Sequence, residues 1–227
     1  MGLFYVLVGV FAGCWMIRGH FARGAMIALF LWLAFLSGRM DWVALLIAFG
    51  WGALWPAYIR LTERKFQFAL YAALIVISFG FKLHQFPGFT NLQISEKFWL
   101  GLEAPLVGLL PLAFCVPLAR YKGDWGQVYK GWWLAIGGIA LMTVLAVSGG
   151  TVHWQAKWPT YAGLRYFSNF FLTCIPEEAF YRGFVQAELK RFLQGSLSPR
   201  GAGGIALVVS AAIFTLAHIG WSPNFAI

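Results

Sequence analysis

The sequence predicts an all-α fold, a polytopic transmembrane helix bundle of about eight spans. Hydrophobic residues make up 60% of the chain and charged residues only 11%, whereas about a quarter of the residues of a typical soluble domain are charged. A chain with so few polar side chains cannot cover its own surface with them, so most of that surface must face lipid. The basic residues lie in the breaks between apolar stretches, as they do in the loops of membrane proteins.

The apolar stretches between the charged breaks define the expected spans. In chain order they are Leu3–Ile17, Ala25–Ser37, Trp42–Ile59, Phe68–Gly80, Trp99–Ala119, Trp132–Ser148, Tyr166–Val185 and Gly204–Gly220. The first, second and fourth are shorter than the roughly 20 residues that cross a bilayer, so each is expected as a tilted helix extended through its flanks or as a re-entrant piece. The sequence shows no internal repeat and no low-complexity linker, and one membrane domain is the simplest organisation.

The positive charge of the chain indicates a lipid environment rather than nucleic acid. The net charge is +9, but the Lys and Arg residues gather in alternate loops instead of forming one patch. Many Trp residues lie near the ends of the expected spans, where an interfacial aromatic belt would place them. We therefore expect an integral multi-pass membrane protein whose partner is the lipid bilayer, with no nucleic-acid partner.

Two polar features have a structural explanation. Glu103 lies close to the start of the Trp99–Ala119 span, so its carboxylate is expected to reach the membrane interface. The stretch "HQFPGFTN", from His84 to Asn91, contains a Pro-Gly pair and is expected to be a turn-rich loop at the membrane surface. The alternative interpretation is that this loop lies beside the opening through which a substrate enters.

The stretch "CIPEEAFYRGF", inside the apolar run Tyr166–Val185, carries three charged side chains at membrane depth. An ionisable group there costs at least about 2.5–3.5 kcal/mol, so each one needs a compensating role. Residues four apart share a helix face, so Glu178 and Arg182 are predicted to pair. Glu177 lies about 100° around the helix from Glu178, and we predict that its carboxylate faces a cavity with no committed partner. The alternative is a buried ion-pair cluster that only locks helix packing.

Pro176 precedes the two glutamates and interrupts the helical hydrogen bonding. A proline inside a helix removes a backbone hydrogen bond, whereas at the first position of a helix it is well tolerated. The helix is therefore expected either to kink at Pro176 or to start a new segment there. Both alternatives indicate a polar pocket, because irregular backbone at membrane depth persists only against protein or a water-filled cavity.

The next span contains "FTLAHIG", in which Phe214 and His218 lie four residues apart and so on one helix face. The short connection from the preceding span predicts that the two helices are antiparallel neighbours. Glu177 and His218 would then meet at one depth, where such a pair can activate a water or hold a metal that does so. Phe214 is expected to pack beside the imidazole. A packing role alone stays open for His218.

These residues resemble the motifs of one membrane protease family. "EEAFYR" matches the EExxxR motif, and "FTLAH" the FxxxH motif, of the CAAX-protease and bacteriocin-processing (CPBP) intramembrane proteases. The resemblance implies that Glu177 activates the hydrolytic water and that His218 assists, with Glu178, Arg182 and Phe214 in supporting positions. The family has been described both as metalloproteases and as glutamate-dependent proteases, so zinc at Glu177 and His218 is implied only if a metal is used.

The likeness covers about Tyr166 to Gly220 and lacks one part of the family pattern. The third motif of the family is a His followed four residues later by Asn or a similar polar residue. Four residues after His218 stands Ser222, so this motif is not found before Ile227. Two explanations stay open: the third motif lies beyond Ile227, or the chain is a degenerate member of the family.

The sequence thus leads us to expect N-terminal transmembrane helices of unassigned role in residues 1–150 and a catalytic-type core in residues 151–227. The resemblance implies an intramembrane endopeptidase of CAAX-protease type, which hydrolyses a peptide bond of a membrane-associated or prenylated substrate with a Glu/His-activated water. The alternative is a non-catalytic membrane scaffold or bacteriocin-immunity-type protein that binds a partner in the same pocket. We expect the protein to be located in the bacterial inner membrane.

Overall fold

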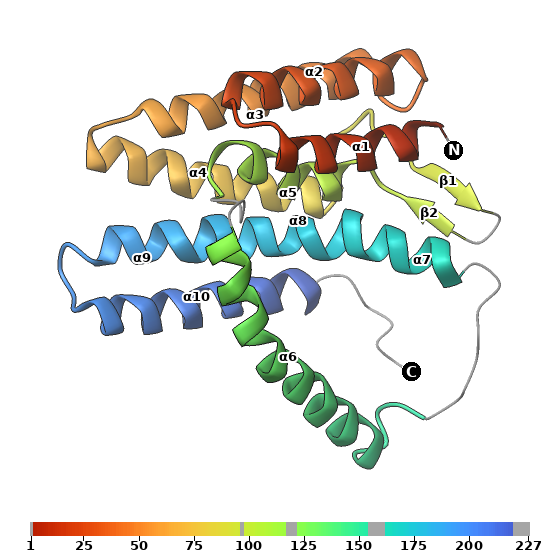
Figure 1. Ribbon diagram of the computed structural model, residues 1–227. Coiled ribbons are helices and arrows are strands. Elements are labelled where there is room, and N and C mark those ends of the chain that lie inside the picture. The colour runs from red at the N-terminus through yellow and green to blue at the C-terminus, as the bar shows by residue number, and fades with distance from the viewer. Residues whose placement is uncertain (1, 96–97, 117–121, 154–161, 220–227) are drawn as a thin grey trace. The chain divides into compact units, whose positions relative to one another are not determined.

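The computed structural model describes residues 2–95, 98–116, 122–153 and 162–219 (Figure 1). The chain folds into two compact units, one made of Met1–Val116 and Phe167–Ile227 and the other of Pro117–Tyr166. The units do not follow the ranges 1–150 and 151–227, because the last helices pack with the first ones.

The first unit begins with four apolar helices and a short hairpin. They are α1 (Gly2–Met16), α2 (His20–Leu36), α3 (Trp42–Arg60), α4 (Arg64–Lys82), β1 (Leu92–Ser95) and β2 (Phe98–Leu100). The strands pair antiparallel, with Leu92 opposite Leu100. The sequence predicts the start of a span at Trp99, and this boundary is wrong, because the backbone hydrogen bonds of residues 98–100 go to the neighbouring strand.

The central element of this unit is α5 (Glu103–Phe114), whose residues 105–113 are all buried. It contacts α1, α2, α3 and α4 on one side and the helical stretch with the two glutamates on another. Its 12 residues extend about 18 Å at 1.5 Å per residue, well short of a hydrocarbon core of about 30 Å. Within the predicted span Trp99–Ala119, the helix is α5, which is short and enclosed by other helices, and residues 117–119 lie outside the described residues.

The first unit is completed by a long helical stretch and a final helix. In chain order the elements are α7 (Ala162–Asn169), which crosses the boundary between the units, η1 (Phe170–Cys174), α8 (Ile175–Glu177), η2 (Glu178–Gln186), α9 (Ala187–Leu193) and α10 (Pro199–Ile219). Figure 1 shows η1 to α9 as one continuous rod, with α10 antiparallel beside it. The predicted antiparallel packing of these two spans is confirmed.

Pro176 is the second residue of α8, and the helix continues through it instead of starting a new segment there. Cys174 and Glu178, on either side of α8, both keep right-handed helical backbone angles. The flanking η1 and η2 are π-helical, with hydrogen bonds from residue i to i+5. Wider turns of this kind accommodate a residue that lacks an N–H and whose ring would clash one α-helical turn back.

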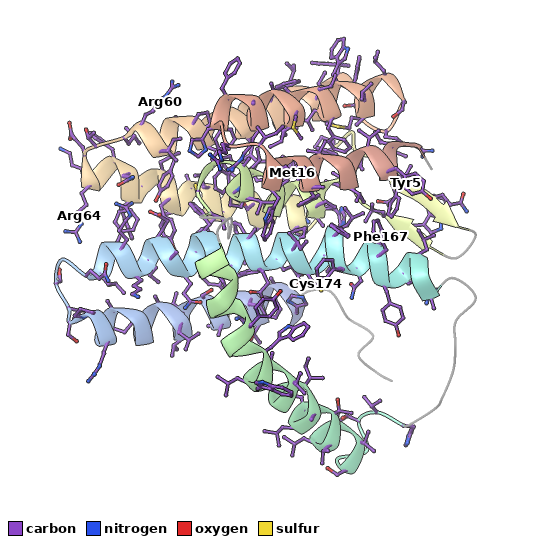
Figure 2. All side chains as sticks on the ribbon, viewed as in Figure 1. Tyr5, Met16, Arg60, Arg64, Phe167 and Cys174 are labelled. Atoms are coloured by element: carbon purple, nitrogen blue, oxygen red, sulfur yellow. The ribbon has the colours of Figure 1, made fainter. Side chains whose placement is uncertain are left out.

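The second unit contains α6 (Lys122–Ser148). Within the described residues, four helical segments are long and apolar enough to cross a membrane: Trp42–Arg60, Arg64–Lys82, Gly131–Ser148 and Pro199–His218. Arg60 and Arg64 flank the connection between α3 and α4 (Figure 2). The protein is therefore an all-α integral membrane protein with one added hairpin, and the count of eight spans is not confirmed.

Candidate functional site

The two glutamates are placed by a very close approach of α5 and α8. Gly108 on α5 faces Pro176, and a Cβ atom at Gly108 would lie only 2.0 Å from the α-carbon of Pro176. Only a residue without a side chain permits such an approach. The contact seats Glu177, the residue after Pro176, directly against the central helix.

The π-helical segment η2 is held from both sides by side-chain hydroxyls. The Tyr71 hydroxyl, on α4, donates to the carbonyl oxygen of Val185 at 2.8 Å. The Ser210 hydroxyl, on α10, donates to the carbonyl oxygen of Tyr181 at 2.8 Å. These two bonds fix η2 in register with both neighbouring helices. The segment is unusual, since π-helical turns are rare and often occur at functional sites.

Glu177 is the point where three helices meet. Its Oε1 accepts a hydrogen bond from Nζ of Lys82, the last residue of α4, at 2.8 Å. The same oxygen lies 3.5 Å from Nε2 of His218 on α10. The predicted meeting of Glu177 and His218 is confirmed. The prediction that the Glu177 carboxylate has no committed partner is wrong, because Lys82 neutralises it.

Lys82 is the residue at this site that the sequence analysis missed. Its side chain is 14% exposed and that of Glu177 is 25% exposed, so the pair is largely enclosed. The ammonium also lies 5.3 Å from the centroid of the Tyr181 ring, within the range of a cation–π interaction. The available signal was a Lys at the end of an apolar helix, where the helix dipole favours a positive charge. That position also suits a merely interfacial Lys, so the sequence alone did not distinguish the two.

The imidazole of His218 is oriented by its own helix and by Phe214. Its Nδ1 lies 2.8 Å from the carbonyl oxygen of Phe214, which can only accept, so Nδ1 carries the proton of this hydrogen bond. The Phe214 ring packs against the imidazole at 4.3 Å between ring centroids, as predicted. In the neutral imidazole, Nε2 therefore presents a lone pair toward Glu177. A shared proton or a water donating to both would join these two acceptors.

Glu178 and Arg182 form the predicted ion pair, with Arg182 Nε 3.0 Å from Glu178 Oε2. The pair is not buried inside the protein, since its side chains are 59% and 73% exposed. Adjacent glutamates thus have different partners: Glu178 pairs within its own helical stretch, and Glu177 pairs across to α4 and α10. A cluster that only locks helix packing would not leave one of its pairs so accessible.

Two pockets meet at Glu177. The larger, here called the motif pocket, has a volume of about 250 Å³, and its lining includes Cys174, Glu177, Glu178, Tyr181, Arg182 and Phe214. The smaller, here called the Lys82 pocket, has a volume of about 50 Å³ and is lined in part by Lys82, Glu177 and Tyr181. Cys174, which is labelled in Figure 2, is the last residue of η1 and lines the motif pocket. Water-sized molecules fit in both pockets beside a carboxylate, which is what a hydrolytic site at membrane depth requires.

Among the described residues, the donor atoms near Glu177 do not make up a zinc site. Zinc in proteins takes at least three protein ligands, and the described residues contain no group of three or more His, Cys, Asp or Glu side chains placed to hold a metal. Glu177 and His218 would supply two ligands. The Lys82 ammonium bonds to the same carboxylate oxygen that faces His218, so a cation there would meet a like charge.

Comparison with known proteins supports the resemblance drawn from the motifs. No curated protein and no solved structure matches the chain. Residues 158–227 match the family model described as "Type II CAAX prenyl endopeptidase Rce1-like", and this range contains all the motif residues of the site. In these residues the protein is therefore similar to the CAAX prenyl endopeptidases, which is consistent with the CPBP motifs.

Proposed function

We propose that the protein is an intramembrane endopeptidase of CAAX-protease type in which Glu177 and His218 activate the hydrolytic water. The observation that supports this most directly is the 3.5 Å approach of Glu177 Oε1 to His218 Nε2 beside the motif pocket. A carboxylate and an imidazole acceptor facing one small space are the groups that general-base hydrolysis needs. The match of residues 158–227 to a CAAX endopeptidase model favours the same chemistry.

The free oxygen of Glu177 is suited to act as the base. Lys82 and His218 both approach Oε1, and within the described residues no donor lies at hydrogen-bonding distance from Oε2. A water in the motif pocket can donate one hydrogen to Oε2 and the other to Nε2 of His218. Both bonds orient the water oxygen and increase its nucleophilicity.

The reaction then follows the path of general-base hydrolysis. The water oxygen forms a bond to the scissile carbonyl carbon, while one O–H bond breaks and its proton passes to Glu177. The C–N bond breaks next, and Glu177 returns the proton to the departing amine nitrogen. The products are a carboxylic acid and an amine, and Glu177 is ionised again for the next cycle.

The substrate in this proposal is a membrane-associated or prenylated protein, and the membrane is the bacterial inner membrane. A site enclosed by apolar helices favours a peptide that already lies in or on the bilayer. The family model points to prenylated chain ends as the substrate class.

The test uses the full chain in phospholipid vesicles and an internally quenched peptide that ends in a farnesylated CAAX sequence. Glu177→Gln and His218→Ala are each expected to lower kcat/KM by about 10²–10⁴-fold, the usual contribution of a general base. The control is Glu63→Gln, a change at an exposed carboxylate that pairs with Lys65. A wild-type chain that does not cleave, or a Glu177→Gln variant with full activity, would contradict the proposal.

A non-catalytic scaffold or immunity role is favoured by one observation, the accessibility of the Glu178–Arg182 pair in the motif pocket. An exposed ion pair offers a partner both a donor and an acceptor. This role predicts that cells expressing the chain resist a bacteriocin, that resistance survives Glu177→Gln, and that Arg182→Gln abolishes it. Cleavage that depends on Glu177 would instead support the protease.

A further inference from the structure

We propose that Lys82 is a positioning residue of this site, which holds Oε1 of Glu177 and thereby leaves Oε2 to accept the proton of the water. The inference rests on the proposed function. It begins from the contact of Lys82 Nζ with Glu177 Oε1 at 2.8 Å, which joins α4 to α8. No motif in the sequence includes Lys82.

The surroundings of Lys82 hold its ammonium in one orientation, toward Glu177 and the Tyr181 ring. Its side chain is 14% exposed, and it lines the Lys82 pocket together with Glu177 and Tyr181. The Tyr181 ring lies 5.3 Å from Nζ and offers its face to the charge. A flexible Lys stem has little freedom when its charged end is held by both a carboxylate and an aromatic ring.

The charge of Lys82 also suits the proposed reaction. In the resting site the ammonium balances the Glu177 carboxylate. When the water gives its proton to Glu177, the carboxyl becomes neutral and the negative charge moves to the former carbonyl oxygen of the substrate. The positive charge of Lys82 stays beside the site throughout, so the net charge of the enclosed region does not change during bond formation.

The other groups that face Glu177 do not replace this charge. Those that titrate are His218 from α10 and, from its own helical stretch, Cys174, Glu178 and Tyr181. From α5, the Lys82 pocket receives Ala104 and Val107, which do not titrate. Arg182 is committed to Glu178. Among these described neighbours, Lys82 is the cation bonded to Glu177.

The experiment measures kcat and KM of the full chain in phospholipid vesicles for the wild type, Lys82→Met and Lys82→Arg. In Lys82→Met we expect kcat to fall by about tenfold or more and KM to stay within about threefold, because Lys82 acts through Glu177. Lys82→Arg keeps the charge and should keep most of the wild-type kcat.

The matched control is Lys65→Met, at the opposite end of the same helix, where the side chain is 76% exposed. It should leave kcat and KM unchanged. A wild-type kcat in Lys82→Met, while the wild type cleaves and Glu177→Gln does not, overturns the role of Lys82 and leaves the protease proposal intact. Absence of wild-type cleavage contradicts the protease proposal itself.

A variant that fails to fold also gives a decision. If Lys82→Met does not accumulate, the double variant Lys82→Met/Glu177→Gln removes the carboxylate that was left without its cation. Recovery of folded protein in the double variant supports the pairing. Failure of both variants to accumulate, together with an inactive Lys82→Arg, would assign Lys82 a folding role and overturn the proposal.

Discussion

Lys82, the last residue of α4, and His84, two residues after it, each pair with a carboxylate from another helix, and the two pairs differ in their surroundings. Lys82 Nζ lies 2.8 Å from Glu177 Oε1, and His84 Nδ1 lies 2.8 Å from Glu103 Oε1. Glu103 is only 5% exposed, and the walls of the two site pockets do not include it. Glu177 is 25% exposed and lies where those two pockets meet.

Both pairs have the same N–O distance, so this distance alone does not distinguish a carboxylate with a structural role from one that takes part in a reaction. Glu103 is enclosed at the start of the central helix, and its Oε2 has no hydrogen-bond partner among the described residues. Glu177 has an equally short ion pair, but its side chain lines both site pockets. We therefore interpret the His84–Glu103 pair as structural and the Lys82–Glu177 pair as functional.

The largest expected effect on stability comes from a change on α5 that displaces Glu177 and therefore the Lys82–Glu177 pair. Gly108→Ala would place a Cβ against the backbone of Pro176 and should lower the free energy of unfolding by about 3 kcal/mol, at the upper end of overpacking effects. SDS-induced unfolding measures the change, and cleavage should fall with it because Glu177 is displaced. The control is Gly50→Ala, where a Cβ meets nothing within 4 Å. Equal stability of the two variants would contradict the close approach.

A smaller effect is expected from Glu103→Ala. Removing this carboxylate breaks a hydrogen bond to a charged group and should lower the free energy of unfolding by about 2 kcal/mol. Cleavage per folded molecule should stay within about threefold of wild type, since Glu103 does not line either site pocket. SDS-induced unfolding and peptide cleavage are measured on the same preparation. A Glu103→Ala variant that folds normally and loses cleavage would place Glu103 in the site and remove the contrast between the two pairs.

The smallest effect on stability is expected from Glu178→Gln. The Glu178–Arg182 pair is exposed and four residues apart on one helical stretch, so losing it should change the free energy of unfolding by less than about 0.5 kcal/mol. Thermal unfolding of the detergent-solubilised protein tests this, with Glu63→Gln as a second exposed carboxylate for comparison. A loss of about 2 kcal/mol or more, on the scale of a buried charged hydrogen bond, would show that the pair is structural.

Much of the fold follows from the sequence because the hydrophobic effect acts on local runs of residues. The long apolar stretches at α3, α4 and α10 are helices close to their predicted limits. The stretch from Trp99 differs, because apolar residues predict burial without deciding between strand and helix. There the first residues of the stretch pair with β1 in the hairpin. The helix that follows, α5, is short and is enclosed by other helices.

Part of the site was also predicted from the sequence. The i,i+4 spacing predicted the Glu178–Arg182 pair, and the antiparallel packing of consecutive helices predicted that Glu177 and His218 would meet. The burial of Glu103 was not predicted. Its position near a helix start favoured the membrane interface, and only its 5% exposure in the folded protein shows that it lies inside.

The sequence by itself determined that the chain resides in a membrane as a helical bundle and that Glu177 and His218 lie on neighbouring helices where they can meet. Those conclusions depend on composition and on spacings within one helix or between neighbouring helices. Only the tertiary structure decided that Lys82 neutralises Glu177 and that Glu177 lines two pockets. The partner of a buried charge comes from whichever helix packs against it, and the packing of α4 and α5 against α8 depends on contacts between residues far apart in the chain, such as Gly108 with Pro176.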